Sequence, residues 1–142
     1  MRFGKCIPFV GAAALAMATA CATPMDNTAS NENLVAYSAS TAYPDSAKTD
    51  TSTTMGTVVE SGVHMLRIEN FGQNAISDAD VWVNGSFVYK VASIPPDSYV
   101  KLDLSKFYDH DGHSFVDSQG TVTKVQLHLG DRMWTLLGPI SQ

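Results

Sequence analysis

The densest group of residues that could do chemistry lies in the segment 107–117, which reads FYDHDGHSFVD. Carboxylate oxygens and imidazole nitrogens are the groups that bind calcium and zinc in proteins. A metal site is therefore one interpretation of this segment. Its ionisable side chains are Asp109, His110, Asp111, His113 and Asp117.

A structural loop is the other interpretation. A calcium loop of the EF-hand type with Gly112 at its sixth position would begin at Phe107 and end at Ser118, where carboxylates are required. That assignment fails. Zinc needs three or four converging ligands, while Asp, Gly, His and Ser are also common turn residues. We therefore expect a loop and no cofactor, with the candidate metal ligands being Asp109, His110, Asp111 and His113.

Support for catalysis is weak. The sequence contains no Gly-x-Ser-x-Gly, no His-Glu-x-x-His and no Gly-rich phosphate loop. His64 and His128 fall on predicted strands, at surface positions.

The net charge of −5 argues against binding nucleic acid or anionic lipid by charge. We expect a protein that is not an enzyme, although a mechanism with paired carboxylates is left open.

Three aromatic residues flank a predicted hairpin. The Asn-Gly pair at 84–85 lies between ADVWV and SFVYKV, and such a pair is a strong signal for a two-residue turn. That turn places Val88 opposite Val81 and Phe87 opposite Trp82. The valines then supply the core. The opposite face carries Trp82, Phe87 and Tyr89.

This aromatic face has two interpretations. It could be a platform for a sugar ring, a peptide or another protein. Alternatively, the N-terminal residues or the loop 105–121 cover it, because domains rarely leave such patches bare.

The elements that position these residues are short strands. Alternation of apolar and polar residues in LRIEN, VKLDL and KVQLHL predicts half-buried strands from about Val63 onward. A second hairpin at 130–131 places Leu127 opposite Trp134, which makes Trp134 a core residue. The prolines at 95–96 predict a rigid turn at a sheet edge. Six or seven strands in about 80 residues indicate a β-sandwich.

Two stretches, IENFGQNAISDADVWVNG and SIPPDSYVKLDL, resemble bacterial immunoglobulin-like modules of the fibronectin type III group. Asp97 stands where those modules often have Gly, and the disulfide of antibody domains is absent. The resemblance implies an all-β fold, a small immunoglobulin-like antiparallel β-sandwich over 63–142. It implies no function, since one fold serves many.

The N-terminus has the pattern of an export signal. Arg2 and Lys5 precede about 15 uncharged, mostly apolar residues, and small residues follow. A membrane span needs roughly 20 apolar residues, so the pattern predicts a secretory signal peptide over 1–20.

Ala18-Thr19-Ala20-Cys21 resembles the lipobox of bacterial lipoproteins, with Ala18 where leucine is usual. The resemblance implies lipidation of Cys21. Because Ala22 rather than Asp follows, it also implies the periplasmic face of the outer membrane. Plain cleavage that leaves a free thiol is the alternative.

Residues 21–62 are rich in Ser, Thr and Asn and show no lasting period, which predicts a flexible tether with a reach of about 35 Å. The patch LVAY at 34–37 could dock on the domain. Together these features predict a lipid-anchored envelope protein that holds or recruits a protein partner, through an open sheet edge or the aromatic face. The alternative is a small ligand-binding module, for a glycan or a metal.

Overall fold

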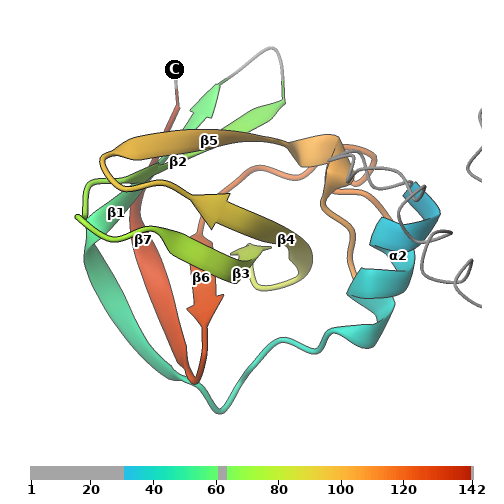
Figure 1. The fold of residues 1–142 in the computed structure, drawn as a ribbon. Coiled ribbons are helices and arrows are strands. Elements are labelled where there is room, and N and C mark those ends of the chain that lie inside the picture. The colour runs from blue at the N-terminus through green and yellow to red at the C-terminus, as the bar shows by residue number, and fades with distance from the viewer. Residues whose placement is uncertain (1–30, 61–63, 142) are drawn as a thin grey trace, which may run out of the picture.

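The computed structural model describes residues 31–60 and 64–141, with the side chains of 140 and 141 left out. The predicted signal peptide and Cys21 lie outside the described residues. One α-helix, one 3₁₀ helix and seven strands follow one another along the described chain (Figure 1). They are α2 (Asn31–Ser40), β1 (Lys48–Glu60), β2 (Met65–Asn70), β3 (Ile76–Val83), β4 (Phe87–Ile94), β5 (Ser98–Asp103), η1 (Leu104–Lys106), β6 (Val125–Leu129) and β7 (Arg132–Ser141).

The strands form one mixed sheet in the order β4-β3-β6-β7-β1-β2-β5. Neighbouring strands are antiparallel except for β1 and β7, which are parallel. The sheet curls, because a single cluster of buried residues draws side chains from all seven strands. The all-β prediction is confirmed, while the immunoglobulin-like identity stays a prediction.

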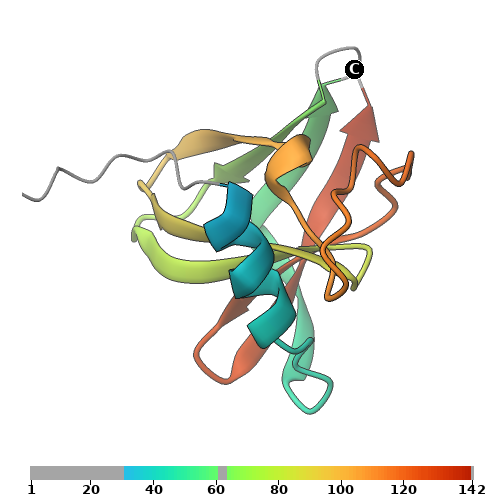
Figure 2. The ribbon, with the colours of Figure 1, turned by 90° about the vertical axis from the view of Figure 1, so that its right-hand side faces the viewer.

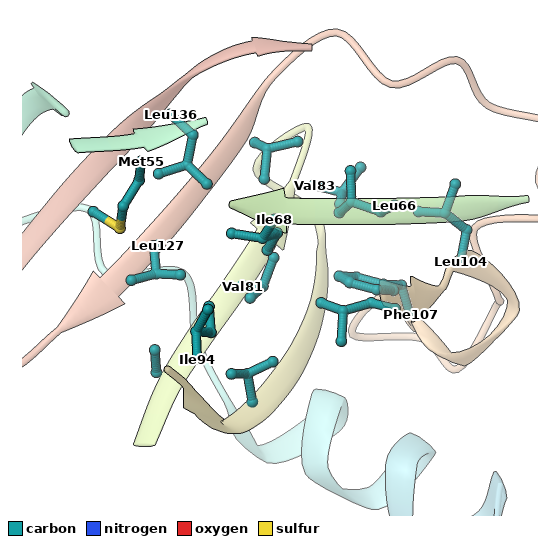
Figure 3. Close-up of a cluster of buried hydrophobic side chains, with 14 of the residues drawn as sticks. Met55, Leu66, Ile68, Val81, Val83, Ile94, Leu104, Phe107, Leu127 and Leu136 are labelled. Atoms are coloured by element: carbon teal, nitrogen blue, oxygen red, sulfur yellow. The ribbon is translucent and has the colours of Figure 1, made fainter. Parts of the chain in front are cut away.

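The core lies on the inner face of the curled sheet (Figure 3). Leu66 and Ile68 on β2 point into it from alternate positions, as the LRIEN pattern predicts, and both are fully buried. Phe107, which follows η1, is also fully buried and fills the space beside Leu66 and Leu104. Burying one such side chain contributes about 1.5–3 kcal/mol, so these residues are the main source of stability.

The predicted tether is wrong for residues 31–60, which belong to the folded domain. Residues 31–40 form α2, and β1 lies inside the sheet between β7 and β2. Thr is polar in composition, but its branched Cβ fits a pleated strand, so the run of Thr and Val at 49–59 pairs readily. The domain thus begins well before residue 63.

The register of the first hairpin also differs from the prediction. Val83 pairs with Phe87, and Trp82 pairs with Val88, so the turn has three residues rather than two. The side chain of Asn84 explains the difference, because its Oδ1 accepts from the backbone N–H groups of Thr123 and Lys124. A one-residue slip moves every side chain of β4 to the opposite face.

Other local predictions are confirmed. β4 and β5 are joined across the turn at residues 95–97 and are the two end strands of the sheet, as the prolines indicate. Leu127 pairs with Trp134 across the second hairpin. Trp134 packs against the core and is only partly buried.

Residues 31–47 form a strap across the outer face of the sheet, and Figure 2 shows α2 lying there. Ser38 of α2 is 1 % exposed, and the Tyr43 hydroxyl donates to Gln126 Oε1 at 2.7 Å. Tyr37 of the LVAY patch packs against the cluster of Trp82, Val88 and Met133 on this face, so the patch docks on the domain, which is one of the two alternatives given above.

We predict that a variant starting at residue 63 does not unfold cooperatively, whereas one starting at residue 31 does. Without β1, both β7 and β2 lose a pairing partner, and the core loses Met55. Thermal unfolding followed by circular dichroism distinguishes the two. A sharp transition in the shorter variant would contradict the assignment of β1 to the domain.

Candidate functional site

The aromatic face predicted around Trp82 is not formed. Trp82 lies on the outer face of the sheet, where it is only 3 % exposed. It packs with Val88 and Met133 under the strap, and the Tyr43 ring lies nearly perpendicular to it at a centroid distance of 5.2 Å. Trp82 is a structural residue that holds the strap to the sheet.

Phe87 and Tyr89 lie on the opposite, inner face. The Phe87 ring meets Phe115 edge-on at 5.2 Å, and the Tyr89 ring lies 5.4 Å from that of Phe107. The N-terminal residues therefore cover Trp82. The loop after β5 covers Phe87 and Tyr89. This is the second of the two interpretations, and the three residues do not form one binding platform.

The loop between η1 and β6 does bring candidate metal ligands together. Potential ligand atoms of Asp109, Asp111 and His113 all lie within 4.8 Å of one another. His110 is not in this group; it is exposed and, with Asp111, lines a pocket of about 450 Å³ beside Tyr43. Asp117, also exposed, lies outside the group.

Asp109 organises this loop. Its Oδ1 accepts the backbone N–H of Asp111 at 3.0 Å and that of His113 at 2.8 Å, and its Oδ2 lies 3.3 Å from His113 Nδ1. Desolvation acts to raise the pKa of Asp109, but the hydrogen bonds from His113 and Asp111 outweigh it and hold that pKa below its ordinary value. The carboxylate is therefore ionised and partly engaged at neutral pH.

A groove that the sequence analysis missed lies between the two end strands of the sheet, and we call it the β4–β5 groove. Its volume is about 550 Å³. Tyr89–Ser93 of β4 and Val100–Leu102 of β5 line it, and α2 closes one side. Alternation alone could have identified the two strands, but only the strand order shows that both are edges.

Two lysines are the charged residues among the described groove lining, and they are about half exposed. Lys90 Nζ lies 3.9 Å from Asp80, and Lys101 Nζ lies 3.2 Å from Glu60. The floor is apolar, because Val91 and Leu102 are buried core residues. The groove combines an apolar floor with a basic rim on an acidic chain.

Tyr37 joins the strap to the sheet next to this groove. Its hydroxyl donates to the Asp80 carboxylate. Burial, together with the hydrogen bond and the charge of Asp80, raises the pKa of Tyr37 to about 12. The neutral phenol is therefore the form that the fold stabilises.

Comparisons of the chain with protein-family models, curated proteins and solved structures found no match. Among the described helices, none is long and apolar enough to cross a membrane. The role of each candidate site therefore has to be inferred from its own geometry.

We predict that Tyr37→Phe lowers stability near neutral pH by about 1 kcal/mol, the typical value of one hydrogen bond. The folded chain keeps the Tyr37 proton above pH 10, where the unfolded chain releases it. Its contribution is therefore complete below pH 10 and declines as the pH rises toward 12. Urea unfolding from pH 8 to 11.5 should show a shallower decline in Tyr37→Phe than in wild type.

Tyr99→Phe is the matched control, because Tyr99 is 51 % exposed and lies on β5. It should follow the wild-type pH profile. Parallel profiles for Tyr37→Phe and wild type would show that the Tyr37–Asp80 contact does not hold the strap.

Proposed function

We propose that this is an exported protein, lipid-anchored through Cys21 in the cell envelope, whose domain binds a partner protein without catalysis. The observation that carries the proposal is the pair of end strands along the β4–β5 groove. The outer edge of β4 is bridged by Tyr108 at Val88, and the groove lies along the residues that follow, Tyr89–Ser93. An extended segment of the partner would add there as a strand, which is a common mode of peptide recognition.

The chemistry of the groove supports a selective partner. Backbone N–H and C=O groups at an edge supply affinity for any strand, and the apolar floor accepts alternate side chains. Lys90 and Lys101 lie at the rim, each beside a carboxylate of this chain, and a carboxylate on the bound segment would share their ammonium groups with Asp80 and Glu60. Lysines at edges also oppose uncontrolled pairing between copies of a chain. An acidic, extended peptide is the partner that this surface fits.

The anchor would hold the domain near the membrane. About ten residues separate Cys21 from Asn31, the first residue of α2. Even fully extended, they span at most about 36 Å. The localisation we propose is the periplasmic face of the outer membrane, where the anchor would raise the local concentration of the domain for an envelope partner.

The test places the photoreactive amino acid p-benzoylphenylalanine at Ser93, which is exposed and lines the groove. We predict a discrete cross-linked envelope protein in intact cells, lost in Cys21→Ala and reduced in Lys90→Ala with Lys101→Ala. The same probe at Thr121, exposed in a loop away from the groove lining, is the control. The captured protein is then purified, and amide exchange should slow in β4 and β5 when it binds.

Two results would count against this function. One is an equal adduct from Ser93 and Thr121, which indicates crowding rather than recognition. The other is binding by the purified partner that leaves β4 and β5 exchange unchanged.

A metal-binding role is the second candidate, and the cluster of Asp109, Asp111 and His113 is the observation that favours it. Two carboxylates and one imidazole suit Zn²⁺, with water as a fourth ligand. Backbone hydrogen bonds to Asp109 organise the loop, and Asp109 Oδ2 lies 3.3 Å from His113 Nδ1, so these two ligand groups are already adjacent.

If the cluster binds Zn²⁺, the thermal midpoint of unfolding rises with added Zn²⁺ and returns to its starting value with chelator. We expect Asp111→Asn with His113→Ala to abolish the rise. His110→Ala should retain it, because His110 is adjacent in sequence but outside the cluster. An unchanged midpoint in the wild type rules the metal role out.

A further inference from the structure

A third pocket lies where β1 separates from β7, and we call it the Trp134 pocket. Its volume is about 410 Å³, within the range of small-molecule sites. Its lining comes from the bulged part of β1, the end of β2, the loop before β3, and β7. The lining residues on which the argument depends are Thr53, Thr54, Asn70, Gln73, Asn74 and Trp134.

An irregularity in the sheet opens this pocket. Thr51 pairs with Thr135, and the next pair is Gly56 with Leu137. β1 therefore uses more residues than β7 over the same stretch and bulges away from it. Met55 turns inward to the core, while Thr53 and Thr54 are exposed at the pocket.

The opposite wall is held in place by Asn70, which is 2 % exposed. Its Nδ2 donates to the backbone oxygens of Asn74 at 2.9 Å and Pro95 at 3.1 Å, and its Oδ1 accepts the N–H of Gly72 at 2.9 Å. Because one buried carboxamide fixes both sides of the loop, the wall is preformed and needs no ordering when a ligand binds.

The chemistry of the lining is uniform. No residue that lines the described pocket carries an ionisable side chain, on a chain whose net charge is −5. Hydroxyls and carboxamides dominate instead. The exposed side chains of Thr53, Gln73 and Asn74 make no hydrogen bond to another described residue, so their donors and acceptors are available to a ligand.

Trp134 supplies the apolar surface. Its indole is partly exposed, and the Arg132 guanidinium carbon lies 4.8 Å from the ring centroid. Arg132 in turn binds the Asp50 carboxylate. The ring is thus held in a fixed orientation, with its position set by β7 and the core.

From these observations we propose that the Trp134 pocket binds a neutral saccharide. A sugar ring presents an apolar C–H face to an aromatic ring and hydroxyl groups to side-chain donors and acceptors. The lining carries no ionisable side chain, and the adjacent Arg132 is already paired with Asp50, which together disfavour charged ligands. The exposed amides and hydroxyls disfavour a purely apolar one. This inference goes beyond the proposed partner binding and shares no lining residue with the β4–β5 groove.

The chain contains two tryptophans, which permits a direct test. Trp82→Phe leaves Trp134 as the sole tryptophan, and it removes an indole N–H that has no hydrogen-bond partner among the described residues. The probe is an array of uncharged oligosaccharides of glucose, N-acetylglucosamine, galactose and mannose. Hits are titrated against the full-length wild type and the full-length Trp82→Phe variant, after thermal unfolding has shown that the variant is folded. We expect a saturable change in Trp134 fluorescence with at least one of them.

Variants then locate the site. Thr53→Ala and Asn74→Ala should each weaken binding by about tenfold, the effect of one lost hydrogen bond. Thr49→Ala is the matched control, since Thr49 is exposed on the same strand outside the pocket, and it should bind as wild type. If no oligosaccharide in the array changes Trp134 fluorescence, the proposal is overturned. It is also overturned by binding that Thr53→Ala and Asn74→Ala leave unchanged, provided that thermal unfolding shows both variants folded.

Discussion

The parallel pairing of β1 with β7 is the interaction on which the rest of the structure depends. In the strand order it is the single link between the four strands β4-β3-β6-β7 and the three strands β1-β2-β5. Because the joined sheet curls, both halves contribute to one core. β4 and β5 are the two end strands of the joined sheet. The strap leads directly into β1, so the cover over Trp82 is positioned by the same pairing. The irregular middle of the pairing opens the Trp134 pocket.

How far the sequence predicts this fold depends on whether local or distant contacts decide each element. Leu66 and Ile68 alternate strictly with charged residues, so β2 was predictable from burial alone. β1 was missed because its many Thr residues match a linker in composition, and only its central place in the sheet explains its conformation. The first turn depends on the contacts of Asn84 with Thr123 and Lys124, about 40 residues further along the chain. No rule based on neighbouring residues includes such contacts. Three of the candidate metal ligands do converge, because Asp109 closes a local turn.

The aromatic residues that look most suited to binding are largely used in packing: Trp82 is buried, and Phe87 and Tyr89 are partly buried. Trp82, Phe87 and Tyr89 stabilise the strap and the core, where large aromatic rings contribute most. The surfaces that we propose for binding are built instead from inconspicuous residues. They are the outer edge of β4 with Ser93, and the hydroxyls and amides around Thr53 and Asn74. In a domain of this size the apolar residues are needed for stability. Recognition then depends on polar side chains and backbone groups at the end strands and at the irregular pairing of β1 with β7.

The joining of β1 to β7 also has a consequence for biogenesis. The first and last strands of the described chain meet in the middle of the sheet, with Lys48 beside Arg132. Pairings so distant in sequence require a large loop to close and therefore form late. A nascent chain in which β7 has not yet been made cannot join the two halves, so it should remain unfolded until Arg132–Ser141 is available to pair with β1.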